Sequence, residues 1–273
     1  MRYYFLLFIL FLSASFTFSQ KEDDPKYEYH YKQVDKYEND FYSIKIADAH
    51  SQQSFTKFKI RITNKTTDYL ILKTGEISFF YDFGELHPKN KEFLIEPGKT
   101  LNKVISVSDA SKNFHVKSLK VKINGIYKMS FNGKTIKMPD FQLPANKNYV
   151  ESQYVSCKLN NLKKETKQTA VQFKCTYTGD NYLIINPLKA NAKIETGQEF
   201  APVNRKAKTK ILTKNQKKKF TLYYEIQAKI VDMQFATLNI IWHDTFKESI
   251  ADKLKGLDLN FEFDAEKTKA KNN

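Results

Sequence analysis

An internal repeat constrains the fold of this chain more than any other feature of its sequence. Three segments of the first half recur in the same order in the second half: residues 43–46 as 156–159, residues 58–71 as 173–184 with two residues removed in the turn, and residues 119–123 as 238–242. The offset grows from 113 to 119, as small loop insertions would produce. Solenoid repeats run to about 20–50 residues, so this longer repeat indicates two copies of a whole domain.

The repeated segments carry the alternation that is typical of half-buried β-strands. In residues 55–63, Phe58, Ile60 and Ile62 fall on one face of a strand and cationic side chains fall on the other. Such strand signals recur at roughly 8–12-residue spacing, which is typical of an all-β sandwich or barrel. We therefore predict an all-β fold with two tandem β-sandwich domains. A single larger β-barrel is the alternative, and it fits the repeat and the usual domain size less well.

The chain divides into five predicted segments. They are a signal peptide at 1–19, a polar lead-in at 20–40, β-sandwich domains at 41–146 and 147–263, and a charged tail at 264–273. Within the lead-in, Tyr27, Tyr29 and Tyr31 alternate as they would in an edge strand. The tail lacks periodicity, so we expect it to be frayed.

Residues 1–19 have the three parts of a secretory signal peptide. Arg2 gives a positive start, residues 3–12 form an unbroken apolar run, and residues 13–19 turn small and polar. A membrane-spanning helix needs about 20 apolar residues, so the alternative of a membrane anchor is disfavoured. We predict cleavage before Gln20 and a mature chain that is secreted, periplasmic or on the cell surface, without a transmembrane segment.

The strand and turn signals of the first copy follow a familiar order. They comprise the turn at 63–66, the strand at 69–71, the Pro-Gly turn at 96–100, and the strands at 104–107 and 119–123. This order resembles the immunoglobulin-like domains of unknown function found in secreted bacterial proteins, over residues 42–125. In the second copy, Lys214 and Asn215 stand in for Pro97 and Gly98. The resemblance implies two immunoglobulin-like sandwiches and brings no assigned activity. The antibody hallmark of two cysteines around a buried tryptophan is absent from the first copy.

Cys157 and Cys175 are the two cysteines of the chain, and each lies on the apolar face of a predicted strand. By the repeat they take the positions of Ile44 and Ile60. A hairpin turn centred on residues 163–168 places them almost opposite each other, and an exported chain with two such thiols is expected to form a disulfide. The closed loop would contribute about 3 kcal/mol. The alternative is two buried free thiols, because opposed strand pairs do not always allow good disulfide geometry.

The chain is strongly basic, with 45 Lys and Arg against 30 Asp and Glu. A candidate anion-binding strip holds eight cationic residues and no acid: Arg205, Lys206, Lys208, Lys210, Lys214, Lys217, Lys218 and Lys219. It fits an anionic polysaccharide, a lipid head group or an acidic surface protein. Its lack of interleaved aromatic residues argues against nucleic acid. The alternative is that these lysines block unwanted pairing at a sheet edge.

The sequence offers no constellation of catalytic residues. Its five histidines lack the spacing of a zinc site, and its eight glycines form no phosphate loop. His243 and Asp244 could be read as an acid–base pair, but no nucleophile signature accompanies them. We therefore predict no catalytic residue, metal or cofactor, and an exported non-enzymatic protein that binds or scaffolds a partner through loops and sheet edges. The alternative is a carbohydrate-related protein, either a binding module or a poorly marked hydrolase. Trp242 aligns with the inward-facing Ile123, which favours a core position over a sugar-binding platform.

Overall fold

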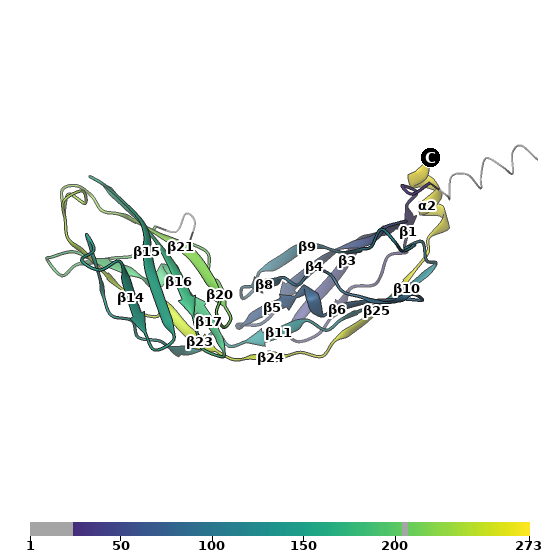
Figure 1. Cartoon of the computed structure of the whole chain (residues 1–273), viewed down its shortest axis with the longest axis horizontal. Coiled ribbons are helices and arrows are strands. Elements are labelled where there is room, and N and C mark those ends of the chain that lie inside the picture. Colours follow the sequence, from purple (N-terminus) through teal and green to yellow (C-terminus); the bar gives the residue numbers. More distant parts are fainter. Residues whose placement is uncertain (1–23, 204–206) are drawn as a thin grey trace, which may run out of the picture. The chain divides into compact units, whose positions relative to one another are not determined.

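The computed structural model describes residues 24–203 and 207–273. The fold is all-β, as predicted, with antiparallel sheets (Figure 1). The described residues form two compact units, in which unit 1 comprises 24–128 together with 253–273, and unit 2 comprises 129–203 and 207–252. Within the described residues, no helix is long and apolar enough to cross a membrane. The predicted signal peptide at 1–19 lies outside the described residues.

Three sheets account for the strands of unit 1, in the orders β1-β3-β4-β9 (with β2 beside β3), β25-β10-β6-β7 and β24-β11-β5-β8. The strands are β1 (Tyr29–His30), β2 (Tyr37–Glu38), β3 (Tyr42–Gln52), β4 (Phe55–Asn64), β5 (Tyr69–Lys73), β6 (Ile77–Tyr81), β7 (Gly84–Leu86), β8 (Glu92–Ile95), β9 (Thr100–Ser108), β10 (Ser118–Ile123), β11 (Ile126–Met129), β24 (Ala251–Lys253) and β25 (Leu257–Glu262). The inward side chains of the three sheets, such as Phe58, Leu70 and Phe79, form one buried core.

Unit 2 has the same three-sheet plan, in the orders β14-β15-β16-β21, β13-β22-β18-β19 and β12-β23-β17-β20. The strands are β12 (Lys134–Thr135), β13 (Phe141–Leu143), β14 (Tyr149–Ser152), β15 (Val155–Glu165), β16 (Gln168–Tyr177), β17 (Tyr182–Ile185), β18 (Asn191–Lys193), β19 (Glu199–Phe200), β20 (Lys210–Leu212), β21 (Lys217–Glu225), β22 (Leu238–Ile241) and β23 (Phe246–Ser249). A short 3-10 helix joins the second and third sheets in each unit: η1 (Thr74–Glu76) and η2 (Pro187–Lys189). The common strand order is the structural counterpart of the sequence repeat.

The pairing register corrects one step of the sequence comparison. Cys157 pairs with Cys175, and Ile44 pairs with Ile62 in the corresponding strands of unit 1. Cys175 is therefore the counterpart of Ile62, and the assignment to Ile60 was wrong. The two-residue deletion is also unnecessary, because both strands then follow the same offset of 113. The sequence comparison aligns the Phe-Lys pair at 58–59 with the Phe-Lys pair at 173–174, whereas the correct correspondence follows from the cross-strand pairs.

The turn that leads into the last strand of the first sheet is built alike in both units. Gly98 has a φ of 66° and Asn215 has a φ of 64°. Glycine adopts this left-handed conformation without steric cost, and asparagine is among the residues that tolerate it best. Lys214 and Asn215 therefore replace Pro97 and Gly98 without changing the path of the chain, and each turn closes with a backbone hydrogen bond of 3.0 Å.

The units differ from the predicted domains 41–146 and 147–263 at their final strands. β25 comes last in the sequence, yet it pairs along its whole length with β10 of unit 1, placing Leu259 opposite Val121. β13 pairs with β22 of unit 2, placing Phe141 opposite Ile240. Each repeat thus gives its closing strands to the unit built by the other repeat. A sequence repeat reveals which strands follow one another, but not which sheet edge the last strand joins.

The described part of the lead-in, residues 24–40, and the charged tail at 264–273 both belong to unit 1. In the lead-in, β1 pairs with β3, and Tyr31 is 1% exposed. The tail forms the helix α2 (Ala265–Asn272), so the expectation of a frayed tail was wrong. The Asp264 carboxylate caps the helix by accepting a hydrogen bond from the Lys267 N–H at 3.0 Å. The Thr268 hydroxyl accepts a hydrogen bond from the His30 N–H at 2.9 Å, which anchors the helix on β1.

Candidate anion-binding face

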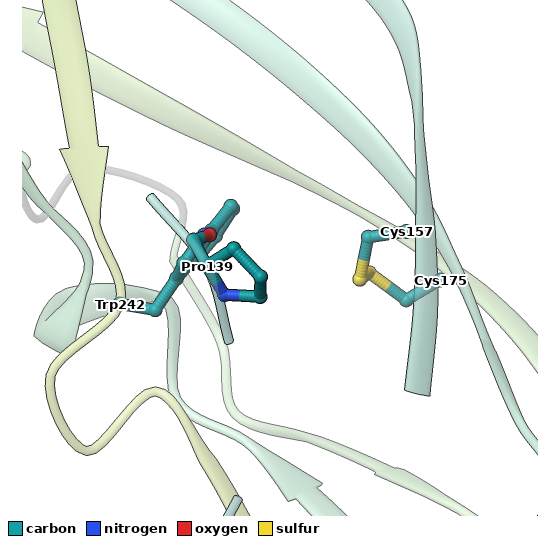
Figure 2. The surroundings of a disulfide bond; sticks show 4 residues. All are labelled: Pro139, Cys157, Cys175 and Trp242. Atoms are coloured by element: carbon teal, nitrogen blue, oxygen red, sulfur yellow. A yellow bond between two sulfur atoms is a disulfide. The ribbon is translucent and has the colours of Figure 1, made fainter. Parts of the chain in front are cut away.

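The predicted disulfide is confirmed, and it joins β15 to β16 in the first sheet of unit 2. Cys157 and Cys175 are fully buried, and their Cα atoms are 4.0 Å apart across β15 and β16 (Figure 2). Trp242 lies in the same core, 2% exposed, and its indole N–H donates to the Pro139 carbonyl at 2.9 Å. The core position expected for Trp242 is therefore confirmed. Because the cysteines point inward, the residue after Cys157 and the residue before Cys175 point outward.

Those outward residues are Lys158 and Lys174, and they pair directly with each other. Lys174 also pairs with Lys219 of β21, so one cross-strand row carries three lysines. Lys217 lies two residues from Lys219 and opposite Thr176 on the same face. We call Lys158, Lys174, Lys217 and Lys219 the lysine face, and all four side chains are exposed.

The lysine face has an electrostatic cost that an anion would relieve. Like charges directly opposite each other on neighbouring strands are destabilising, and the strands are about 4.8 Å apart. Among the described residues, no carboxylate forms a salt bridge with any of the four lysines. A polyanion lying across the row would therefore contact three cations that have no competing partner in the described part of the chain.

The structure divides the predicted basic strip among several surfaces. Arg205 and Lys206 lie outside the described residues. Lys208 lies in an exposed loop, and Lys210 lies on β20 opposite Ile185. Lys214 forms an ion pair of 2.7 Å with Asp180. On β21, Lys217 and Lys219 lie on the outer face, whereas Lys218 lies opposite Cys175 on the inward-facing side. The six described residues of the strip therefore do not form one surface, because alternation along β21 places Lys218 on the other side of the sheet.

Lys158 and Lys174 were missed by the sequence analysis, although a signal for them was present. Each is adjacent to a cysteine, and the expected cysteine pairing already placed them opposite each other. The predicted strip is a run of neighbouring residues, whereas the lysine face combines the hairpin strands β15 and β16 with β21, which lies about 40 residues further along the chain.

His243 and Asp244, which follow β22, interact with different partners. The His243 ring nitrogen Nε2 is 2.7 Å from Glu199 Oε2, while Asp244 accepts a hydrogen bond from the Thr135 hydroxyl at 2.8 Å. Hydrogen bonds from Asn191 and His243 lower the pKa of Glu199. Across the described ranges, no group of three or more His, Cys, Asp or Glu side chains is arranged to hold a metal ion.

A second charged site, which the sequence did not indicate, lies on unit 1. His30 is 6% exposed, its Nε2 is 3.0 Å from Glu28 Oε2, and its ring stacks on that of His50 with centroids 5.4 Å apart. Burial lowers the pKa of His30, and the Glu28 carboxylate opposes this effect. A groove of about 490 Å³ adjoins the pair, and Lys267 of α2 is part of its lining.

Comparison with known proteins gives no family. No family model matches the chain, and no curated protein does. Solved structures with some similarity include an exo-β-D-glucosaminidase (12% identity, 70% of this chain and 25% of that one, TM-score 0.26) and a red sea bream transglutaminase (6% identity, 69% and 27%, TM-score 0.20). A conserved domain protein from Bacillus anthracis shows 8% identity over 85% of this chain and 91% of that one, with a TM-score of 0.22. The chain spans about a quarter of the first two, and these low scores support no functional argument.

Proposed function

We propose that this chain is an exported, non-enzymatic binding or scaffolding protein that contacts an anionic partner through the lysine face. The observation that carries the proposal is the row formed by Lys158, Lys174 and Lys219, which is exposed and has no carboxylate partner among the described residues. The signal peptide expected from the sequence supports export. The Cys157–Cys175 disulfide is in keeping with an oxidising compartment.

The proposed partner is an anionic polysaccharide. The lysines lie on the outer face of a four-stranded sheet, where an extended polymer that crosses the strands can reach the whole row at once. At one end of the row, Tyr149 pairs with Lys158 and is 53% exposed. A tyrosine ring presents an apolar body with a polar tip, which suits a partner that is partly apolar and fully hydrated. We infer that the row supplies the charge contacts and that Tyr149 adds an apolar contact.

Retention on a sulfated polysaccharide matrix tests the proposal. The double variant Lys174→Glu with Lys219→Glu should elute at much lower salt than the wild type, because it reverses two charges of the row. The control variant, Lys99→Glu with Lys120→Glu, makes the same change in net charge at exposed positions of unit 1, and it should elute close to the wild type. Equal elution of the wild type and the row variant rejects the proposal. An equal shift in both variants would show that net charge alone controls retention, which also rejects it.

A further inference from the structure

Strand β9 forms one edge of the first sheet of unit 1, and its outer side has backbone groups available for pairing. Two hydrogen bonds at the ends of β9 show which of its residues direct their backbone N–H and C=O groups toward β4. Asn64 N–H donates to Lys99 C=O, and Asp109 N–H donates to Ser54 C=O, each at 3.0 Å. Antiparallel pairing alternates the direction of the backbone groups. Asn102, Val104, Ser106 and Ser108 therefore point their N–H and C=O groups away from β4. Among the described residues, β9 pairs with β4 alone and these outward groups form no backbone hydrogen bond.

A groove of about 580 Å³ runs beside this edge. One wall is the stretch from Lys103 to Ser108, and the other is the chain that leads into β8. Thr74 holds that second wall in place, because its hydroxyl donates to the Lys89 carbonyl at 2.6 Å and accepts from the Lys91 N–H at 3.0 Å. The groove is therefore bounded by ordered backbone on both sides.

The groove is cationic with an aromatic contact. Lys89, Lys91 and Lys103 are among its lining residues, and none of the residues that line it is Asp or Glu. The Lys103 ammonium lies over the Phe93 ring, 4.5 Å from the centroid. On the outer face of the same strand, Val104 is 57% exposed. A strand placed along this edge would therefore meet both positive charge and an exposed apolar residue, because Val104 also lines the groove.

Unit 2 shows how such an edge is used. In β21, the Tyr177 N–H donates to the Gln216 C=O, so Gln216 directs its backbone groups toward β16. By the same alternation along the strand, Tyr223 directs its N–H and C=O groups away from β16. The Tyr223 carbonyl accepts a hydrogen bond of 2.6 Å from the N–H of Val203, so the chain itself adds a backbone donor to this edge. Ser106 takes the corresponding place in β9, counted from the equivalent turn residues Gly98 and Asn215. Its outward groups have no such partner among the described residues.

We propose that the edge of β9 binds an extended acidic segment of a partner protein as an added β-strand. A peptide is the fitting occupant because alternating N–H and C=O groups recognise another backbone, as in other cases of strand addition. Acidic side chains fit because the lining residues carry three lysines and no carboxylate. This inference goes beyond the proposed polysaccharide contact, and it concerns a different surface on the other unit.

A fluorescein-labelled synthetic peptide of about eight residues, with Glu and Val alternating, is a suitable probe for fluorescence anisotropy with the full-length mature protein. Ser106→Pro removes an outward N–H and obstructs the approach of a strand. It spares the hydrogen bonds to β4, because proline is tolerated where an edge N–H faces solvent. Ser106→Ala is the matched control, since it keeps the N–H. Losing one net hydrogen bond should weaken binding about fivefold or more, whereas Ser106→Ala should bind like the wild type.

Two further arms keep the test decisive if Ser106→Pro fails to fold. The peptide is also prepared with N-methyl groups at alternate residues, in each of the two possible alternations, and one of them should lose binding to the wild-type protein. Lys89→Glu combined with Lys91→Glu should weaken binding of the Glu-Val peptide and strengthen binding of a Lys-Val peptide. The inference is overturned if both methylated peptides bind like the parent, or if no saturable binding occurs up to ~1 mM peptide. Neither result bears on the lysine face, whose test uses residues of unit 2.

Discussion

Replacing Phe261 with alanine tests which unit the final strand of the chain completes. Phe261 lies on β25, is 1% exposed, and packs against Phe58 with ring centroids 5.5 Å apart. Truncation of a buried phenylalanine costs about 3–5 kcal/mol, and a domain between the 60–100-residue and the 150–250-residue size classes loses about 4 °C of melting temperature per kcal/mol. We therefore expect the transition of unit 1 to fall by more than about 10 °C, although Phe261 belongs to the second sequence repeat.

The assay separates the two units because the chain has a single tryptophan. Trp242 lies in the core of unit 2, so its fluorescence reports that unit, while near-UV circular dichroism of the many tyrosines also reports unit 1. Phe141→Ala is the reciprocal variant, since Phe141 is 4% exposed and packs edge-on against Phe173 at 5.1 Å. It should lower the Trp242 transition, and Phe261→Ala should leave that transition unchanged. If Phe261→Ala shifts the Trp242 transition and Phe141→Ala does not, the assignment of the closing strands is refuted.

Three other predictions follow from particular contacts. Reduction of the Cys157–Cys175 disulfide should lower the stability of unit 2 by about 3 kcal/mol, seen as an earlier Trp242 transition, while the near-UV transition of unit 1 stays in place. Because burial lowers the pKa of His30, the unfolded chain takes up the proton first. The contribution of neutral His30 to the stability of unit 1 is therefore fully present above pH ~6.5, and it is lost as the pH falls from there through the lower pKa of the folded state. His30→Gln should flatten this part of a curve of melting temperature against pH, and an unchanged curve would contradict the reasoning. Asp264→Ala should cost about 0.5–2 kcal/mol through loss of the cap on α2, with faster amide exchange in α2 than in the wild type and no change in unit 2.

The local features of the fold were predictable because they depend on local alternation. Residues 55–63 alternate between apolar and cationic side chains, and they form β4 with Phe58 and Ile62 buried. The disulfide was predictable from the apolar faces around the two cysteines and the hairpin between them. The helix α2 was not recognised, although Asp264 is a favourable N-cap residue, because the segment has no apolar stripe. Its stability depends on hydrogen bonds to β1, which lie far away in the sequence.

The exchange of closing strands could not be predicted from the sequence. β13 and β25 carry the same alternation whichever unit they join, so the choice depends on the length and direction of the connections. Part of the lysine face could have been predicted, because a pairing of Cys157 with Cys175 also places Lys158 opposite Lys174. The groove beside β9 could not be predicted from the sequence, because it depends on which sheet edge remains unpaired after folding.

Calorimetric titration with a sulfated polysaccharide tests the central claim most directly. The triple variant Lys158→Gln, Lys174→Gln and Lys219→Gln removes the row of charges and leaves the disulfide and core untouched. The wild type should bind at ~0.1 M salt and lose binding near ~1 M, where the Debye length shortens from about 10 Å to about 3 Å. The triple variant should show no binding even at the lower salt, with a Trp242 transition at or above that of the wild type, because the repulsion between opposed lysines is removed. Binding of the triple variant with wild-type affinity would contradict the account.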